Sequence, residues 1–347
     1  MNTSTLKNSA VTLTANDLGA PKITLRQRLA RHPQLFTLAL IIAVCLVVGA
    51  INPEFFQLAM VFDIVRASTV LGLFALGVMI VLAAGGIDVS FAAIAALTMY
   101  GITKLVMTQF PETSMVVILV AGAVGGTLLG VLNGLLVDWL KAPSLIVTIG
   151  TQYLYRGILL TFIGTVFFMN VPHSMDAFGK LAVWRHDTAT GVHAVLPATV
   201  LVLVAAAGLT WWLLNRTLMG RAVYAIGGSL PIAERLGYKL RTVHLFVFGY
   251  AGFLAGLAGI VHVSSTRLAN PFDLVGMELD VIAAVILGGA RITGGSGSVS
   301  GTLLGVLLVT LINNVLILAG VPSTWQKVIV GTFIVLAGAV FASKRSS

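Results

Sequence analysis

The polar stretch at 215–242 holds the residue types best suited to chemistry in this sequence. It includes the run AIGGSLPIAERLGY at 225–238. Ser229 is suited to the N-cap of a short helix, Pro231 to its first turn and Gly237 to its C′ position. The spacing therefore predicts a short helix over 230–237, and the chemistry of such a helix is binding.

Two interpretations of this helix are open. Ile232, Ala233 and Leu236 are expected to share an apolar face, which leaves Glu234 and Arg235 exposed. An amphipathic helix of this kind can dock in a groove on another protein, or it can lie on the lipid surface. Periodicity alone does not separate the two.

A second polar motif, GGIDVS at 85–90, joins two apolar runs. Gly85 and Gly86 are suited to ending one helix, and Asp88 or Ser90 to capping the next by accepting a backbone N–H. Glycine-rich loops can also cradle an anion, but no lysine follows here. Capping and tight turning is the favoured interpretation, and the run GGSGSVS at 294–300 is read in the same way.

The sequence contains almost none of the residue patterns that are typical of enzyme active sites. The pattern G-x-x-x-x-G-K-[ST] of nucleotide-binding loops does not occur, nor does a zinc-type His–Glu spacing or a serine-centred elbow. Cys45 is the only cysteine, so no disulfide framework can form within the chain. We expect no catalytic residue, no metal and no cofactor in this chain.

Composition places these motifs in a membrane. Hydrophobic residues make up 58% of the 347 residues, charged residues make up 10%, and the mean hydropathy is +1.01. Soluble domains carry about 25% charged residues, so a soluble enzyme and a nucleic-acid-binding domain are excluded. The sequence predicts an all-α polytopic protein embedded in the lipid bilayer.

About ten apolar runs are long enough to be considered as spans. A polar, basic tail over 1–32 precedes them. The run at 279–292 is short and is either a crossing or a half-helix. The expected spans are 33–51, 67–84, 89–109, 115–137, 144–167, 195–214, 243–263, 279–292, 297–319 and 325–342.

Charge distribution orients the predicted spans. With ten crossings and a cytoplasmic N-terminus, most of the 21 Lys and Arg residues fall in inside loops, and the C-terminus is also cytoplasmic. Arg66 and Arg267 then lie at outside ends of spans. Arg156 is the one charge well inside a span, and a structural arginine that snorkels or pairs with carbonyl groups is the preferred interpretation.

Internal similarity suggests a repeat. The stretch Gly126–Leu132 recurs identically at Gly301–Leu307. An inverted repeat of a five-helix unit would place both copies in helices of opposite direction, as in many transporter folds. Chance is the alternative, because short runs of Gly, Leu, Val and Thr recur easily in membrane sequences.

Several ordered motifs resemble the permease subunit of the ribose-type, carbohydrate-uptake ABC importers of bacteria. The resemblance covers about 35–342. It departs from the family at Ser229, where the family has Asn, at Pro231, and at Phe91-Ala92, where the family continues Val-Gly. The motifs are AAGGIDVS at 83–90, TIGT at 148–151, YRG at 155–157, Gly220-Arg-Ala-Val-Tyr-Ala-Ile-Gly-Gly228, AERLG at 233–237, GMELDVIAAVILGG at 276–289 and GGSG at 294–297.

Hydropathy and charge predict a permease-type membrane domain over 33–343, with 1–32 and 344–347 cytoplasmic, and the resemblance implies the bacterial inner membrane. It also implies a coupling loop at 215–242 that docks on a cytoplasmic ATPase, in which Gly227 and Gly228 allow a sharp turn. Its implied coupling residues are Gly227, Gly228, Ala233, Glu234, Arg235 and Gly237, and the face prediction adds Ile232 and Leu236.

The implied partners are separate chains. ATP and Mg²⁺ would bind an ATPase with two nucleotide-binding halves, a periplasmic sugar-binding protein would deliver the sugar, and a second copy or a related permease would complete a dimer. Arg66 and Arg267 would dock the binding protein or anchor lipid headgroups.

The alternative function is a self-sufficient secondary carrier or facilitator for a small polar solute. Such a carrier usually places acids within its spans, whereas Asp88, Asp138 and Asp280 fall at predicted ends. The substrate-binding residues and the particular sugar are left open.

Overall fold

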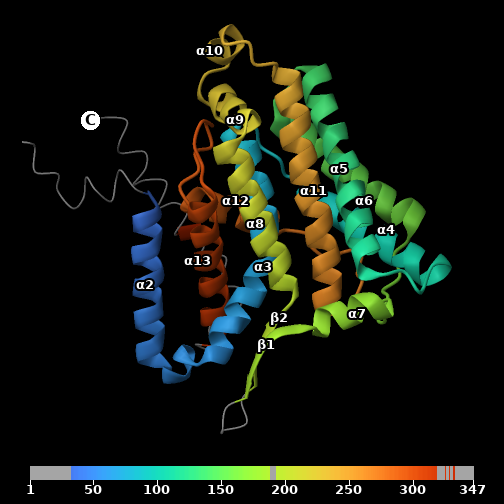
Figure 1. Ribbon diagram of the computed structural model, residues 1–347, viewed down its shortest axis with the longest axis vertical. Coiled ribbons are helices and arrows are strands. Elements are labelled where there is room, and N and C mark those ends of the chain that lie inside the picture. Colours follow the sequence, from blue (N-terminus) through green and yellow to red (C-terminus); the bar gives the residue numbers. More distant parts are fainter. Residues whose placement is uncertain (1–32, 188–192, 319–324, 326–327, 329–330, 333–347) are drawn as a thin grey trace, which may run out of the picture.

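The computed structural model describes residues 33–187 and 193–318, together with residues 325, 328, 331 and 332. It is a bundle of long helices with short helices and one hairpin at its ends (Figure 1). The helices are α2 (Pro33–Ile51), η1 (Pro53–Phe56), α3 (Leu58–Ala83), α4 (Phe91–Gln109), α5 (Met115–Leu140), α6 (Ser144–Ile158), η2 (Leu159–Ile163), α7 (His173–Lys180), α8 (Thr199–Arg216), α9 (Leu218–Gly228), α10 (Leu230–Arg235), α11 (Leu240–Thr266), α12 (Glu278–Leu287) and α13 (Val299–Leu318). The strands are β1 (Ala182–Asp187) and β2 (His193–Pro197).

Within the described residues, six helical segments are long and apolar enough to cross a membrane. They are α3, α4, α5, α6 continued by the π-helical turn η2, α8 and α11. Apolar stretches of α2 and α13, over Gln34–Ala50 and Val299–Asn314, are shorter. The predicted all-α polytopic membrane class is thereby confirmed. Most of the expected span at 325–342 and both terminal segments lie outside the described residues.

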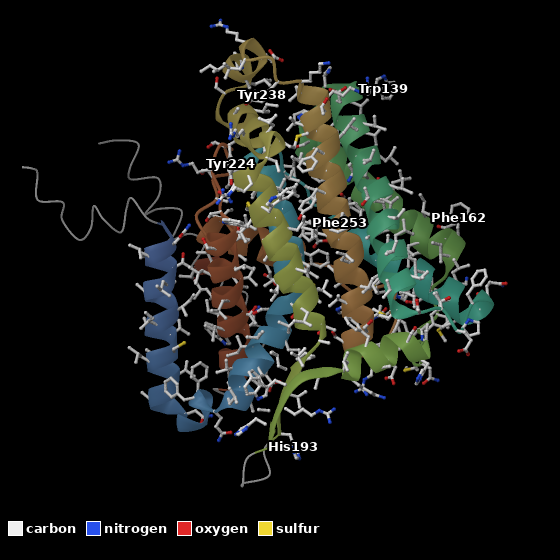
Figure 2. All side chains as sticks on the ribbon, in the orientation of Figure 1. Trp139, Phe162, His193, Tyr224, Tyr238 and Phe253 are labelled. Carbon is white, nitrogen blue, oxygen red and sulfur yellow. The ribbon has the colours of Figure 1, made fainter. Side chains whose placement is uncertain are left out.

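The bundle has two distinct ends (Figure 1). One end, which we call the α9–α10 end, carries those two short helices. The other, the hairpin end, carries α7 and the two strands. Trp139 and Tyr238 mark the α9–α10 end and His193 marks the hairpin end (Figure 2).

The hairpin shortens one expected span. The apolar run at 195–214 was predicted to be helical throughout, but α8 begins only at Thr199. Residues 193–197 instead form β2, which pairs antiparallel with β1 and has buried residues at Ala194 and Pro197. Ala194 is buried and β2 packs on α3. The apolar character of this segment therefore comes from packing on α3.

The run at 279–292 is helical only as far as Leu287, the last residue of α12. The ten residues of α12 rise about 15 Å, whereas the hydrocarbon core is about 30 Å thick. At the hairpin end, α11 finishes against α7, where Gly179 packs on the backbone of Ser264. At the α9–α10 end, α12 finishes where Gly288 packs on Gly301. The non-helical segment 268–277 connects α11 to α12, so the helical part of this run is a half-helix, which was one of the two expectations.

Close helix packing explains much of the glycine content. A Cβ atom on Gly126, Gly130 or Gly256 would overlap backbone oxygen atoms of the facing helix, so α5 and α11 pack with their backbones in contact. The repeated stretch in α13 uses Gly301 and Gly305 in the same way, but against α12. The two copies run in opposite directions, as an inverted repeat requires. Because their glycines serve different partners, the repeat stays a prediction.

Candidate functional site

The predicted short helix in the loop at 215–242 is present as α10. Pro231 lies in its first turn and Gly237 follows it with φ +85°, as expected. The backbone N–H of Tyr238 donates to the carbonyl oxygen of Ala233, which closes the C-terminal turn. The helix ends at Arg235 rather than at residue 237, because the chain enters this turn earlier. Ser229 occupies the N-cap position, but its side chain makes no capping hydrogen bond within the described residues.

The exposed face of α10 differs in one residue from the prediction. Ile232 and Leu236 are 59% and 68% exposed, while Ala233 is fully buried. Glu234 and Arg235 are exposed as expected. Ala233 therefore belongs to the inner side of α10, which packs on α9, and does not share the apolar face. The helix presents two large apolar side chains beside two opposite charges.

A preceding helix holds α10 in place. The hydroxyl of Thr217 accepts a hydrogen bond from the backbone N–H of Gly220 at 3.1 Å and so caps α9. The hydroxyl of Tyr224 donates to the carbonyl oxygen of Gly297 at 2.8 Å. This bond ties α9 to the loop between α12 and α13.

The two glycines at the end of α9 have different surroundings. A Cβ atom on Gly227 would overlap the carbonyl oxygen of Ala83, the last residue of α3. A Cβ atom on Gly228 would meet no non-adjacent atom of the described chain within 4 Å. Neither residue has positive φ. The predicted sharp turn therefore uses positive φ at neither glycine; close packing excludes a side chain at Gly227 but not at Gly228.

Three backbone segments meet at this point, which we call the glycine junction and define by Gly85, Gly227, Gly294 and Gly295. Gly85, Gly294 and Gly295 all have positive φ, at 83°, 88° and 74°. The N–H of Gly295 donates to the carbonyl oxygen of Ala83 at 3.0 Å. The junction therefore joins the end of α3, the end of α9 and the loop before α13 with little intervening side chain.

The motif at 85–90 ends α3 as predicted, and Asp88 accepts a backbone N–H just before α4, whereas the side chain of Ser90 makes no capping bond. Gly85 and Gly86 donate to the carbonyl oxygens of Leu82 and Val81, the pattern of a glycine C-cap. Asp88 is 1% exposed, and one of its oxygens accepts from both the N–H (2.7 Å) and the hydroxyl (2.6 Å) of Ser90. These bonds fix the turn before α4. Burial raises the pKa of the Asp88 carboxyl, and the two bonds from Ser90 oppose that shift.

The same motif is anchored to two further helices. The amide of Asn133 in α5 donates to the hydroxyl of Ser90 at 2.7 Å. The hydroxyl of Tyr155 in α6 lies 2.9 Å from the amide oxygen of Asn133 and donates to the carbonyl oxygen of Leu129 at 3.0 Å. Sequence reasoning missed Asn133, and it named Tyr155 only as part of the YRG motif, with no role. The only available signal was a polar atom within an apolar run, which does not identify the partner.

The two arginines predicted at outside ends both lie at the hairpin end. Arg66 forms an exposed ion pair with Asp63 at 2.9 Å, near the start of α3. Arg267 follows α11 with φ +58° and lines an open polar pocket of about 580 Å³. The pocket is otherwise lined by Met169, Asn170, Val171, His173, Asp176, Lys180 and Thr266. The structure does not bring Arg66 into this pocket.

Arg156 lies within α6, as predicted. Its Nε and Nη2 atoms are buried and have no hydrogen-bond partner in the described part of the chain. The expected pairing of this guanidinium with carbonyl groups is therefore not seen for these two atoms. Among the described residues, no group of three or more His, Cys, Asp or Glu side chains could hold a metal ion.

These features define a multi-pass α-helical membrane protein with an exposed helix tied to its core. The chain belongs to the family described as branched-chain amino acid transport system / permease component, which it matches over residues 60–338. It is therefore a permease.

Named relatives are similar over most of their length. The ribose import permease protein RbsC of Haemophilus influenzae is 32% identical over 303 residues, which cover 86% of this chain and 90% of that protein. RbsC of Bacillus subtilis is 32% identical over 90% of this chain and 91% of its own length. The autoinducer 2 import system permease protein LsrC of Klebsiella pneumoniae is 33% identical over 91% and 88% respectively. No solved structure matches the chain.

Proposed function

We propose that this chain is the transmembrane permease subunit of an ATP-driven importer for a sugar or a sugar-like solute. Relatives named for the import of ribose and of autoinducer 2 support this class of solute. The ATPase with its ATP and Mg²⁺, a solute-binding protein and a second permease are separate chains in this proposal. One observation carries it. The exposed amphipathic helix α10 follows α9, and Gly227 of α9 packs against Ala83 at the end of the buried helix α3.

The way α10 is attached supports a coupling role. A groove on an ATPase would accept Ile232 and Leu236, while Glu234 and Arg235 would pair at its rim. Movement of α10 would pass to α9, and from Gly227 directly to the backbone of Ala83. From Phe74 to Ala83 every residue of α3 is buried, so this helix can carry a displacement into the transmembrane core.

We assign the α9–α10 end to the cytoplasm and the hairpin end to the outside. Loops on the cytoplasmic side of membrane proteins collect Lys and Arg. Asp138 and Glu234 are acids at the α9–α10 end, where basic residues outnumber them. Those basic residues are Lys141, Arg216, Arg221, Arg235, Lys239, Arg241 and Arg291.

The hairpin end would then receive the solute-binding protein. Arg267, Lys180 and His173 line the open polar pocket there, and Arg66 lies elsewhere on the same end. Acidic groups on a binding protein would be attracted to these bases. Docking at Arg66 and Arg267 is part of the proposal.

Purification of the tagged chain from its native membranes tests the class of transporter. We expect an ATPase with two nucleotide-binding halves to copurify, and sugar uptake by reconstituted vesicles to require ATP on the α10 side of the membrane. Uptake that persists without ATP and follows an ion gradient would instead establish a secondary carrier.

A further inference from the structure

Gln152, Arg156 and Glu278 form a polar cluster between α6 and α12. The side-chain amide of Gln152 donates to a carboxylate oxygen of Glu278 at 2.9 Å. Gln152 and Arg156 are four residues apart on α6, so they lie on one face. Glu278 opens α12 and is 8% exposed, and Arg156 lies one helical turn from Gln152, the residue that bonds Glu278.

The cluster lies within the transmembrane depth. Gln152 and Arg156 are near the middle of the 20-residue segment Ser144–Ile163. Glu278 is separated from the α9–α10 end by the whole of α12, about 15 Å of helix. Ionisable side chains are costly at this depth and are typical of solute and ion pathways.

Some N–H donors of the Arg156 guanidinium have no hydrogen-bond partner in the described residues. A guanidinium has five N–H donors, and two of its nitrogens here are buried without a partner in the described residues. Arg156 and Glu278 do not approach within ion-pair distance there either. A closed structural ion pair would satisfy both groups, whereas this arrangement leaves donors beside a carboxylate and an amide.

A discontinuous helix supports a solute site at the same place. Glu278 is the first residue of α12, which starts within the membrane depth after the non-helical segment 268–277. Secondary transporters commonly bind solutes near the bilayer midplane, where such interrupted helices begin, and α12 begins in the same way. The bond from Gln152 connects α12 to α6, so the cluster spans two separate parts of the bundle.

We propose that Gln152, Arg156 and Glu278 form a contact site for the transported solute, a neutral polyhydroxylated molecule. Hydroxyl groups both donate and accept, so they complement the carboxylate of Glu278 and the guanidinium of Arg156 together. One positive and one negative charge leave the cluster without net charge, which suits a neutral solute. This inference rests on the proposed import function.

The main test compares transport with ATP hydrolysis. The complete importer is reconstituted in proteoliposomes, and radiolabelled D-ribose, L-arabinose and D-galactose are the probes. Glu278→Gln and Arg156→Gln should each lower the sugar moved per ATP hydrolysed about tenfold or more, because one charged hydrogen-bonding partner is lost. Hydrolysis stimulated by loaded binding protein should stay within about twofold of wild type.

Tyr250→Phe is the matched control. It removes a buried side-chain contact, the 2.8 Å hydrogen bond with Thr210 between α8 and α11, without touching the cluster. This variant should keep the wild-type ratio of sugar to ATP. An unchanged ratio in both cluster variants would overturn the inference, and a parallel fall of uptake and hydrolysis would show a structural role instead.

A labelling experiment covers the case in which the charge variants do not assemble. Cys45 is the only cysteine, so Cys45→Ala gives a clean background for Gln152→Cys. The imported sugar should slow labelling at position 152 by a small hydrophilic thiol reagent about fivefold, but not labelling of Ser265→Cys at the hairpin end. Equal rates with and without sugar would refute the site. If the wild-type importer moved none of the three sugars, the proposed sugar import itself would fail.

Discussion

Gly227 and Ala83 are in backbone contact, so the last turn of α9 rests on the last residue of α3. A side chain at position 227 would overlap the carbonyl oxygen of Ala83, which already accepts the N–H of Gly295. At position 228, one residue further on, a Cβ atom would point into open space in the described structure. The contact gives the exposed loop a rigid connection to the buried core.

The apolar face of α10 predicts how the ATPase is held. Ile232→Asp together with Leu236→Asp should abolish copurification of the ATPase, because two large exposed apolar side chains would be replaced by charges in a groove. Glu234→Arg should weaken the same association by reversing a rim charge. Quantitative immunoblots of the purified complex measure both effects.

Val183→Asp is the control for this experiment. Val183 is 49% exposed but lies on β1 at the opposite end, so its substitution should leave the ATPase bound. Full recovery of the ATPase with the double α10 variant would show that α10 is not the docking helix.

Labelling of single cysteines tests the proposed orientation of the two ends. In the Cys45→Ala background, His173→Cys on α7 should react with a membrane-impermeant reagent in intact cells, and Glu234→Cys on α10 should react only after the membrane is opened. Both positions are exposed, so burial does not limit the reaction. The reverse pattern would place α10 outside and contradict the coupling proposal.

Charge at the hairpin end predicts salt-dependent docking. Arg267→Glu and Arg66→Glu should each reduce the stimulation of ATP hydrolysis by loaded binding protein, and the reduction should be larger at low salt because screening weakens exposed charge interactions. Titration with binding protein at two ionic strengths measures this. Wild-type stimulation in both variants at low salt would remove these residues from the docking surface.

Removal of a hydrogen bond from the buried network around Asn133 should lower the stability of the protein. Tyr155→Phe removes the hydroxyl that contacts Leu129 and Asn133, and should cost about 1 kcal/mol of unfolding free energy, seen as a lower melting temperature in detergent. Tyr153→Phe is the matched control, because Tyr153 lies on the same helix but is 75% exposed. Equal melting temperatures for wild type and Tyr155→Phe would argue that the network does not stabilise the bundle.

Local signals made parts of this structure predictable from sequence. Pro231 and Gly237 define α10 because a fixed φ and a left-handed turn act within a few residues. Hydropathy predicts most spans because lipid exposure acts on whole segments. The run at 195–214 was misread at its start, since packing on α3 also requires apolar residues and a strand at 193–197 satisfies that requirement.

Tertiary contacts could not be read in the same way. Gln152 and Glu278 are 126 positions apart, and nothing in either local sequence indicates their pairing. The different roles of Gly227 and Gly228 depend on which way each Cα–H bond points, which is set by the helix orientation. Periodicity places Ala233 on the apolar face with Ile232 and Leu236, but it cannot show that Ala233 is buried in the folded protein.

In the proposed mechanism, movement of α10 is transmitted to the transmembrane core through the contact between Gly227 and Ala83. ATP-driven sugar uptake by proteoliposomes that carry Gly227→Ala or Gly228→Ala tests it most directly. Overpacking against backbone costs about 1–3 kcal/mol, so Gly227→Ala should displace α9 and lower uptake about tenfold with the ATPase still bound. Gly228→Ala should transport like wild type. Equal uptake by the two variants, or a larger loss at position 228, would contradict the account.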